Sequence, residues 1–182
     1  DPQKNKRFLH LKDYVGCVLL AGLLILAFPK SDFWICAWGG LVPLMQVLDG
    51  KKPFAAFRWA FLGGLIFFTG TFFWFFHLTQ WFSTIAALGI IILLGYLSVY
   101  FGLFGLSYSL FSRQKPLFKL FLLPSVWVVL EFIRAHLFTG FDWASLGHSQ
   151  YKNLPIIQIA DLTGMFGISF LIVMVNVMLK EC

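Results

Sequence analysis

A glutamate and an arginine interrupt an apolar stretch of the sequence, and these residues are the first to suggest chemistry. Glu131 and Arg134 lie three residues apart in "VVLEFIRAHLF", so they share one face of a helix. Ionised side chains in such a segment are costly unless they pair or line a wet cavity. Asp161 follows in the next apolar stretch. We expect Arg134 to be the counter-ion shared by Glu131 and Asp161, in a structural ion pair between two helices. Direct contact with a substrate is the alternative.

The segment that follows is polar and aromatic, and we expect a compact structured loop over residues 139–155. Trp143 and Tyr151 fit either interfacial anchors or the walls of a cleft for a lipid or an acyl chain. His148 and Gln150 lie between them in "SLGHSQ". His148 has the chemistry of a general base, but no G-x-S-x-G frame and no paired carboxylate accompanies it. We therefore do not expect catalysis from His148.

A second aromatic cluster stands in "GTFFWFFHLTQW", where Trp74 and His77 are three residues apart. On a helix the two side chains face one way, as an aromatic belt with a polar tip. A groove for lipid is the alternative.

No metal or cofactor motif appears elsewhere in the sequence. The four histidines are scattered, and the sequence lacks HExxH, CxxC, an aspartate cluster and a phosphate-binding glycine loop. Cys17 and Cys36 lie in apolar runs and are interpreted as packing residues, and Cys182 as a chain end. We expect no metal and no cofactor.

These residues lie in a chain too apolar for a water-soluble domain. Hydrophobic residues make up 59% of the 182 residues and charged residues only 12%, against about 25% in soluble domains. The composition predicts an all-α, polytopic membrane bundle. The net charge of +6 comes from short basic clusters between apolar runs, which favours membrane orientation over nucleic-acid binding.

About six transmembrane helices are expected in a single domain covering residues 1–182. A spanning helix needs about 20 residues, so the first two segments are short for a full crossing. They form either a thin helical hairpin whose ends snorkel or tilt, or a partly re-entrant pair. The expected helices cover roughly residues 14–28, 33–48, 54–76, 82–111, 117–138 and 156–179.

The basic residues predict that both termini are cytoplasmic and that the loop 139–155 is extracytoplasmic. With this orientation eleven Lys and Arg residues lie inside and three lie outside, a strong positive-inside bias. The three outside are Lys30, Arg134 and Lys152.

Four segments together resemble the bacterial apolipoprotein N-acyltransferases over nearly the whole chain. The third is the most specific, with an E-x-x-R pair, then T-G-F-x-W, then L-G-x-S-Q. The segments are "FPKSDFWICAWGGLVPL", "GGLIFFTGTFFWFFH", "PSVWVVLEFIRAHLFTGFDWASLGHSQ" and "PIIQIADLTGMFGISFLIVMVN".

The resemblance implies an enzyme of the bacterial inner membrane that takes part in lipoprotein maturation. Such enzymes transfer an acyl chain from a phospholipid to the N-terminal lipid-modified cysteine of a lipoprotein, through a thioester on a cysteine. The implied partners are phospholipid, other membrane lipids and the lipoprotein N-terminus. The catalytic Glu, Lys and Cys belong to a nitrilase-like domain that follows a seventh membrane helix and precedes an eighth.

This sequence departs from the family pattern because it contains no nitrilase-like domain. No catalytic residue is therefore assigned in this chain, and alone it is expected to be inactive, as a fragment or the product of a truncated or split gene. The resemblance turns Trp143, Tyr151, His148, Gln150, Trp74 and His77 into candidates for a lipid or substrate cleft. A small six-helix transporter or channel, or a non-catalytic membrane scaffold, remains the alternative function.

Overall fold

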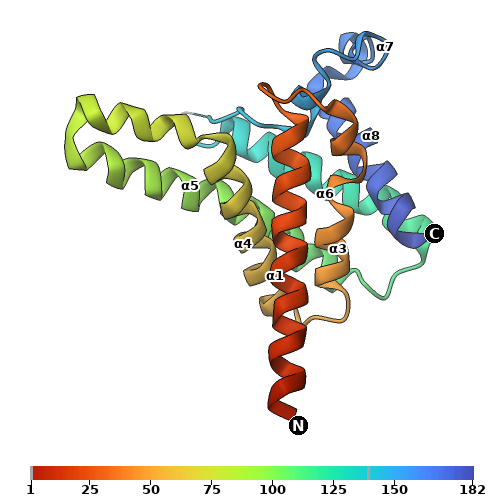
Figure 1. Ribbon diagram of the computed structural model, residues 1–182. Helices are drawn as coiled ribbons and strands as arrows, with labels where there is room; N and C mark the ends of the chain where they lie inside the picture. Colours follow the sequence, from red (N-terminus) through yellow and green to blue (C-terminus); the bar gives the residue numbers. More distant parts are fainter. Residues whose placement is uncertain (1, 139) are drawn as a thin grey trace.

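The structure is a computed structural model that describes residues 2–138 and 140–182, with side chains described for residues 10–77, 85–138 and 140–182 (Figure 1). Within these residues all regular structure is helical, and five helices are long and apolar enough to cross a membrane. This confirms the predicted all-α membrane bundle. The five are α1 (Pro2–Ala27), α4 (Pro53–Thr71), α5 (Thr79–Leu110), α6 (Pro116–His136) and α8 (Ala160–Glu181).

Short helical pieces complete the described chain. A shorter apolar stretch, Trp34–Leu48, supplies the sixth segment. The pieces are η1 (Trp34–Cys36), α2 (Ala37–Gly40), α3 (Val42–Leu48), η2 (Phe73–Leu78), η3 (Leu146–Gln150) and α7 (Leu154–Ile157).

Small residues set the close packing of α4 against α5. A Cβ added to Gly105 of α5 would lie 2.5 Å from the Cβ of Ala60 and 2.7 Å from the carbonyl oxygen of Ala56 on α4. One turn or so away, a Cβ on Gly64 would lie 2.7 Å from the Cβ of Phe101. Membrane helices use such small residues to bring backbones together, since apolar side chains alone give no advantage over lipid.

The second segment differs from the expected continuous helix over residues 33–48 because it breaks after Gly40. In an unbroken helix the Leu41 amide would bond to the Ala37 carbonyl, four residues earlier. The buried Asn176 amide of α8 stands between them instead. Its Oδ1 accepts from Leu41 N at 2.8 Å, and its Nδ2 donates to Ala37 O at 2.9 Å. Asn176 therefore supplies a hydrogen-bond partner to both the Leu41 amide and the Ala37 carbonyl at the break.

Other boundaries also move relative to the expected ranges. α1 starts at Pro2 rather than near residue 14, because hydropathy marks where a helix enters the membrane and not where it begins. α4 ends at Thr71, since Phe72 leaves helical geometry with φ −105° and ψ 21°, and η2 follows. In Figure 1 η2 and the beginning of α5 project sideways from the bundle.

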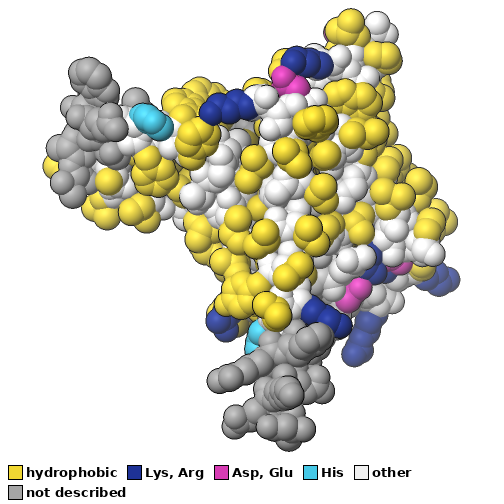
Figure 2. Space-filling view, in the orientation of Figure 1, with side chains coloured by type: hydrophobic (Ala, Val, Ile, Leu, Met, Phe, Trp, Pro, Cys, Tyr) yellow, Lys and Arg dark blue, Asp and Glu magenta, His cyan; other side chains and the backbone are white. Residues whose placement is uncertain are grey.

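Charged side chains gather at the two ends of the bundle. Figure 2 shows an apolar surface between a basic group near the lower end of α1 and a smaller group at the opposite end. At the lower end Lys51 pairs with Asp13 at 2.7 Å, and Lys119 pairs with Glu181 at 2.6 Å. Such a band between polar ends is typical of a chain that crosses a membrane.

Candidate lipid cavity

A cavity of about 720 Å³ opens at the end of the bundle where α1 ends. Four parts of the chain meet around it: the turn after α1, the end of α4 with η2, the loop 140–153, and the start of α8. Aromatic and aliphatic side chains make up most of its wall. The lining residues are Ile25, Phe28, Pro29, Lys30, Ser31, Gly70, Thr71, Phe72, Phe73, Trp74, Trp143, Ala144, Gly147, His148, Tyr151, Ile157, Ala160, Met165 and Ile168.

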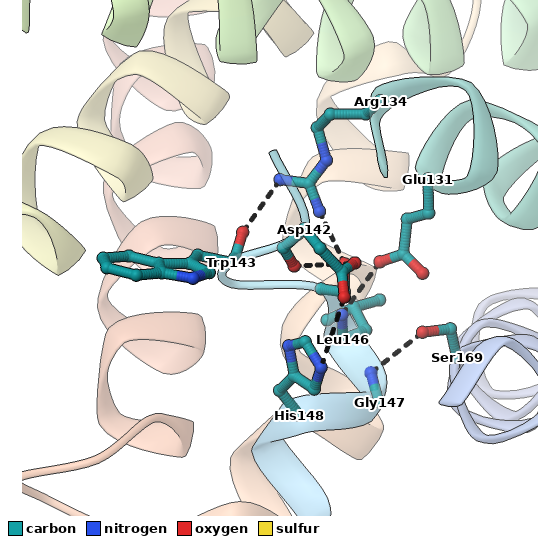
Figure 3. A network of polar contacts seen from close by, with 9 residues as sticks. Glu131, Arg134, Asp142, Trp143, Leu146, Gly147, His148 and Ser169 are labelled. Carbon is teal, nitrogen blue, oxygen red and sulfur yellow. Dashed lines mark hydrogen bonds and ion pairs between the residues drawn. The ribbon is translucent and has the colours of Figure 1, made fainter. Parts of the chain in front are cut away.

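Two ionised residues near the end of α6, Glu131 and Arg134, anchor the loop to that helix (Figure 3). Arg134, 3% exposed, donates to Trp143 O at 3.1 Å and to Ser145 Oγ at 2.7 Å. Glu131, 6% exposed, accepts from the Leu146 amide at 2.8 Å. In the described part of the chain these two side chains therefore bind the loop rather than each other. A buried charge needs such hydrogen bonds to offset the loss of water.

Two further contacts fix the loop against other helices. The Gly147 amide donates to Ser169 Oγ of α8 at 2.8 Å. The buried Gln150 accepts from Trp38 Nε1 at 3.0 Å and donates to Trp34 O at 3.1 Å, which ties η3 to the second segment. Helices far apart in sequence are thereby held at one end of the bundle, and the cavity lies between them.

The outer wall of the cavity is an aromatic cluster. Trp74 and Trp143 stack with ring centroids 6.0 Å apart, and Phe75 lies 6.1 Å from Trp143. Both indoles are partly open to the exterior, at 41% and 54% exposed. The two aromatic segments of the sequence, for which a lipid groove or cleft was one of two interpretations, thus form one wall together.

The turn after α1 is clamped to the loop across the cavity. Asp32 accepts hydrogen bonds from Lys152 Nζ and from the Tyr151 hydroxyl. The hydrogen bond from Lys152, followed by that from Tyr151, lowers the pKa of Asp32 below its ordinary value. The hydrogen bond to Asp32 also raises the pKa of Tyr151 and the pKa of Lys152. Lys30 and Asp32 both have positive φ, 100° and 59°, so the turn is sharp and needs such ties.

The six predicted cleft residues divide into two groups. Trp74, Trp143, His148 and Tyr151 line the cavity, whereas His77 and Gln150 do not. Gln150 is buried in the hydrogen bonds described above, and His77 lies against Phe73 outside the cavity, with ring centroids 6.4 Å apart.

His148 does not have the surroundings of a catalytic base. Its Nε2 lies 3.8 Å from Asp142 Oδ2, too long for a hydrogen bond, and its side chain is 42% exposed. No cysteine lines the cavity in the described residues. Within the same residues no group of three His, Cys, Asp or Glu side chains is placed to hold a metal ion.

The expected ion pair between Arg134 and Asp161 does not form in the described residues. Asp161 is exposed in the first turn of α8. The expectation assumed a regular helix from Pro155 onward. Instead the chain forms α7, then α8, which leaves helical geometry at Gly164 with φ 65° and ψ −174°. The hydrogen-bond partners of Arg134 described above come from the loop, and one of them is a backbone carbonyl.

Several residues of the site lie outside the predicted set. Ser145 and Ser169 bind the loop through single hydroxyls, which carry no distinctive sequence signal. Lys30 lines the cavity and was predicted only to lie on the outer side. The sequence feature that could have identified Lys30 is its position in the tight turn "FPKSDF" between two apolar runs.

The fold and the site together show that the chain is a multi-pass helical membrane domain with an apolar cavity at one end. A family model described as "Apolipoprotein N-acyltransferase N-terminal domain" matches residues 20–178. The chain therefore belongs to the family of apolipoprotein N-acyltransferase N-terminal domains, and the resemblance noted in the sequence is confirmed.

Curated relatives agree with this assignment. The apolipoprotein N-acyltransferase of Geobacter metallireducens is 40% identical over 174 residues, covering 92% of this chain and 33% of the relative. That of Pasteurella multocida is 30% identical over 159 residues, covering 87% and 30%. That of Coxiella burnetii is 32% identical over 165 residues, covering 87% and 34%. The chain spans about a third of the length of these relatives.

Proposed function

We propose that this chain is the membrane domain of an apolipoprotein N-acyltransferase of the bacterial inner membrane, and that its cavity receives an acyl chain of the phospholipid donor. The observation that carries the proposal is the apolar cavity of about 720 Å³ at the loop end of the bundle. Its volume lies within the range of roughly 300–1,000 Å³ that small-molecule sites occupy. Its aromatic wall suits a hydrocarbon chain, and its exposed edge gives a lipid a way in.

In this proposal the residues that carry out acyl transfer belong to a domain other than this membrane domain. An acyl chain passes from a phospholipid ester to a cysteine thiol, which forms a thioester and releases a lysophospholipid with a free hydroxyl. The amine of the lipoprotein N-terminus then displaces the cysteine from the thioester, which forms an amide and returns the free thiol. A reactive thiolate needs an activating base or cation nearby, and no cysteine lines the cavity in the described residues. A nitrilase-like domain would supply the nucleophile, the base and the lysine, so that this chain alone transfers no acyl group.

A chimaeric enzyme tests the function. Residues 20–178 of this chain would replace the matching region of the Geobacter metallireducens relative, in a bacterium depleted of its own N-acyltransferase. Mass spectrometry of a lipoprotein N-terminal peptide separates the diacylated form with a free amine from the N-acylated form. We expect N-acylation from the chimaera and none from the 182-residue chain alone. A well-expressed chimaera that leaves only the diacylated form would overturn the assignment.

Crosslinking tests the cavity directly in the same chimaera. A photoreactive amino acid at Trp143 probes the cavity wall, and one at Phe118 is the matched control, because the two side chains are 54% and 53% exposed. Phe118 lies near the start of α6, outside the cavity, in the wall of a separate and more open hollow of about 480 Å³. We expect phospholipid labelling at position 143 to saturate as lipid is added, and labelling at position 118 to rise linearly. Labelling confined to position 118 would refute a lipid cavity.

A further inference from the structure

Three basic residues stand at the cavity end of the bundle, and two of them have structural partners. Arg134 is buried and holds the loop through Trp143 and Ser145. Lys152 pairs with Asp32. Lys30 differs from both, because in the described residues no ion pair joins it to a carboxylate.

Lys30 is held at the cavity by an aromatic ring. Its Nζ lies 4.1 Å from the centroid of Phe73, a cation–π contact across the space between the turn after α1 and η2. Both residues line the cavity. The clamp between Asp32 and the loop fixes the turn that carries Lys30, so its ammonium is positioned at the rim.

The charge of Lys30 stays uncompensated within the cavity. Among the described residues that line the cavity there is no Asp, Glu or Arg and no second Lys. Asp32 is the nearest acidic residue in sequence, and its two oxygens are already bound by Tyr151 and Lys152. The cavity is thus an apolar volume with one exposed lysine ammonium at its edge.

We propose that Lys30 binds the phosphate of the phospholipid whose acyl chain occupies the cavity, an assignment that rests on the function proposed above. An apolar volume with a single cation at the rim is complementary to an amphiphile with an anionic head. Lysine binds phosphate as a point charge, without the fixed two-point geometry of arginine. Lys30 therefore selects for the phosphate itself and leaves the rest of the headgroup unrestricted.

Two lipids that differ only in the phosphate headgroup provide the test. The full chain in detergent micelles would be titrated with phosphatidylglycerol or with diacylglycerol, each carrying a photoreactive group on the same acyl chain. Labelling of the peptide containing Trp143 gives a half-saturation point for each lipid. The variants are Lys30→Met, Lys30→Arg and, as a control for loss of one exposed positive charge, Lys52→Met at the opposite end of α4.

We expect Lys30→Met to raise the half-saturation point for phosphatidylglycerol roughly tenfold and to leave that for diacylglycerol unchanged. Lys30→Arg and Lys52→Met should behave like the unaltered chain. Unchanged thermal unfolding of Lys30→Met would show that the fold is intact, and Lys30→Gln serves as a second neutral variant should Met perturb it.

The outcomes separate this inference from the function on which it rests. Equal phosphatidylglycerol curves for Lys30→Met and the unaltered chain would overturn the role of Lys30 and leave the lipid cavity standing. An equal loss for both lipids would show that the charge is irrelevant and would also overturn it. The absence of saturable labelling by either lipid would overturn both proposals. Displacement of phosphatidylglycerol by inorganic phosphate alone would assign the site to a free anion and overturn the lipid assignment.

Discussion

Glu131 binds the backbone amide of Leu146, fifteen residues further along the chain, through a buried hydrogen bond of 2.8 Å. The carboxylate lies on α6 and the amide opens η3, so this bond joins the helix to the loop that walls the cavity (Figure 3). Arg134, one turn later, binds the same loop at Trp143 and Ser145. Glu131 and Arg134 thus both hold the loop in place.

Removing the carboxylate should therefore loosen the loop. Glu131→Ala leaves the buried Leu146 amide without its acceptor, which should lower the free energy of unfolding by about 1–3 kcal/mol. Glu131→Gln keeps an oxygen at this place and should cost less than half as much. Unfolding in mixed detergent micelles measures both values. Equal losses for the two variants would show that the charge, and not the hydrogen bond to Leu146, is what matters.

Gln150 should prove structural rather than lipid-binding. Its amide joins Trp38 and Trp34 O across more than 110 residues. Gln150→Ala removes both contacts and should lower the free energy of unfolding by about 1–3 kcal/mol. Trp38→Phe removes one contact and should cost less. In a double-mutant cycle the two changes should couple by about 0.5–1.5 kcal/mol. Additive losses in that cycle would mean that the hydrogen bond contributes nothing.

The clamp at Asp32 should weaken in acid. The pKa of Asp32 is lowered from 3.8 by Lys152 and Tyr151, so its contribution is complete above 3.8 and is lost as the pH falls through the folded-state value. The pKa values of Tyr151 and Lys152 are raised from 10.0 and 10.5, so their contributions disappear only as the pH rises through the folded-state values above these. Between about pH 5 and pH 9 the clamp should be constant.

A nitroxide label on a cysteine placed at Ser31 can report the clamp, with Cys36 and Cys182 replaced by serine. Its spectrum should show low mobility across the neutral range, and mobility should rise only as the pH falls through the folded-state pKa of Asp32, which is lowered from its ordinary value. Asp32→Asn should give the mobile spectrum already at neutral pH. A second label at Gly95 on α5 controls for general unfolding. A Ser31 label that keeps its low mobility in acid, or in Asp32→Asn, would contradict the clamp.

Periodicity and charge predicted the helices of the fold but not the places where they break. Apolar runs located the five long helices, because burial in lipid demands continuous apolar segments. The break after Gly40 depends on Asn176, which lies 135 residues beyond Leu41. A local pattern holds no information about such a partner, so a continuous helix over residues 33–48 was the natural expectation.

The site was predictable in its aromatic residues and not in its polar contacts. Trp74 and Trp143 stood out because indoles gather where apolar and polar surroundings meet. The partner of Arg134 was assigned to Asp161 because opposite charges are visible in a sequence. Its actual partners include the carbonyl of Trp143, and every residue carries a carbonyl. Lys30 acquires its significance only from the cavity and from Phe73 across it.

Gly147 should not tolerate an added side chain unless the loop moves. Its amide donates to Ser169, and an added Cβ would lie 2.4 Å from the carbonyl oxygen of Met165 on α8. Backbone cannot yield as a flexible side chain does, so Gly147→Ala must push the loop away from α8. Overpacking of this kind costs about 1–3 kcal/mol, to be measured as the free energy of unfolding in mixed micelles.

Gly95→Ala on α5 is the matched control, because nothing lies within 4 Å of a Cβ at that position. Alanine has the higher helix propensity, so this change should leave stability unchanged or raise it by up to about 1 kcal/mol. Since Gly147 also lines the cavity, its variant should weaken saturable lipid labelling at position 143, whereas Gly95→Ala should not. A Gly147→Ala chain as stable as the control, with undiminished labelling, would show that the loop does not depend on contact with α8 to form the cavity wall.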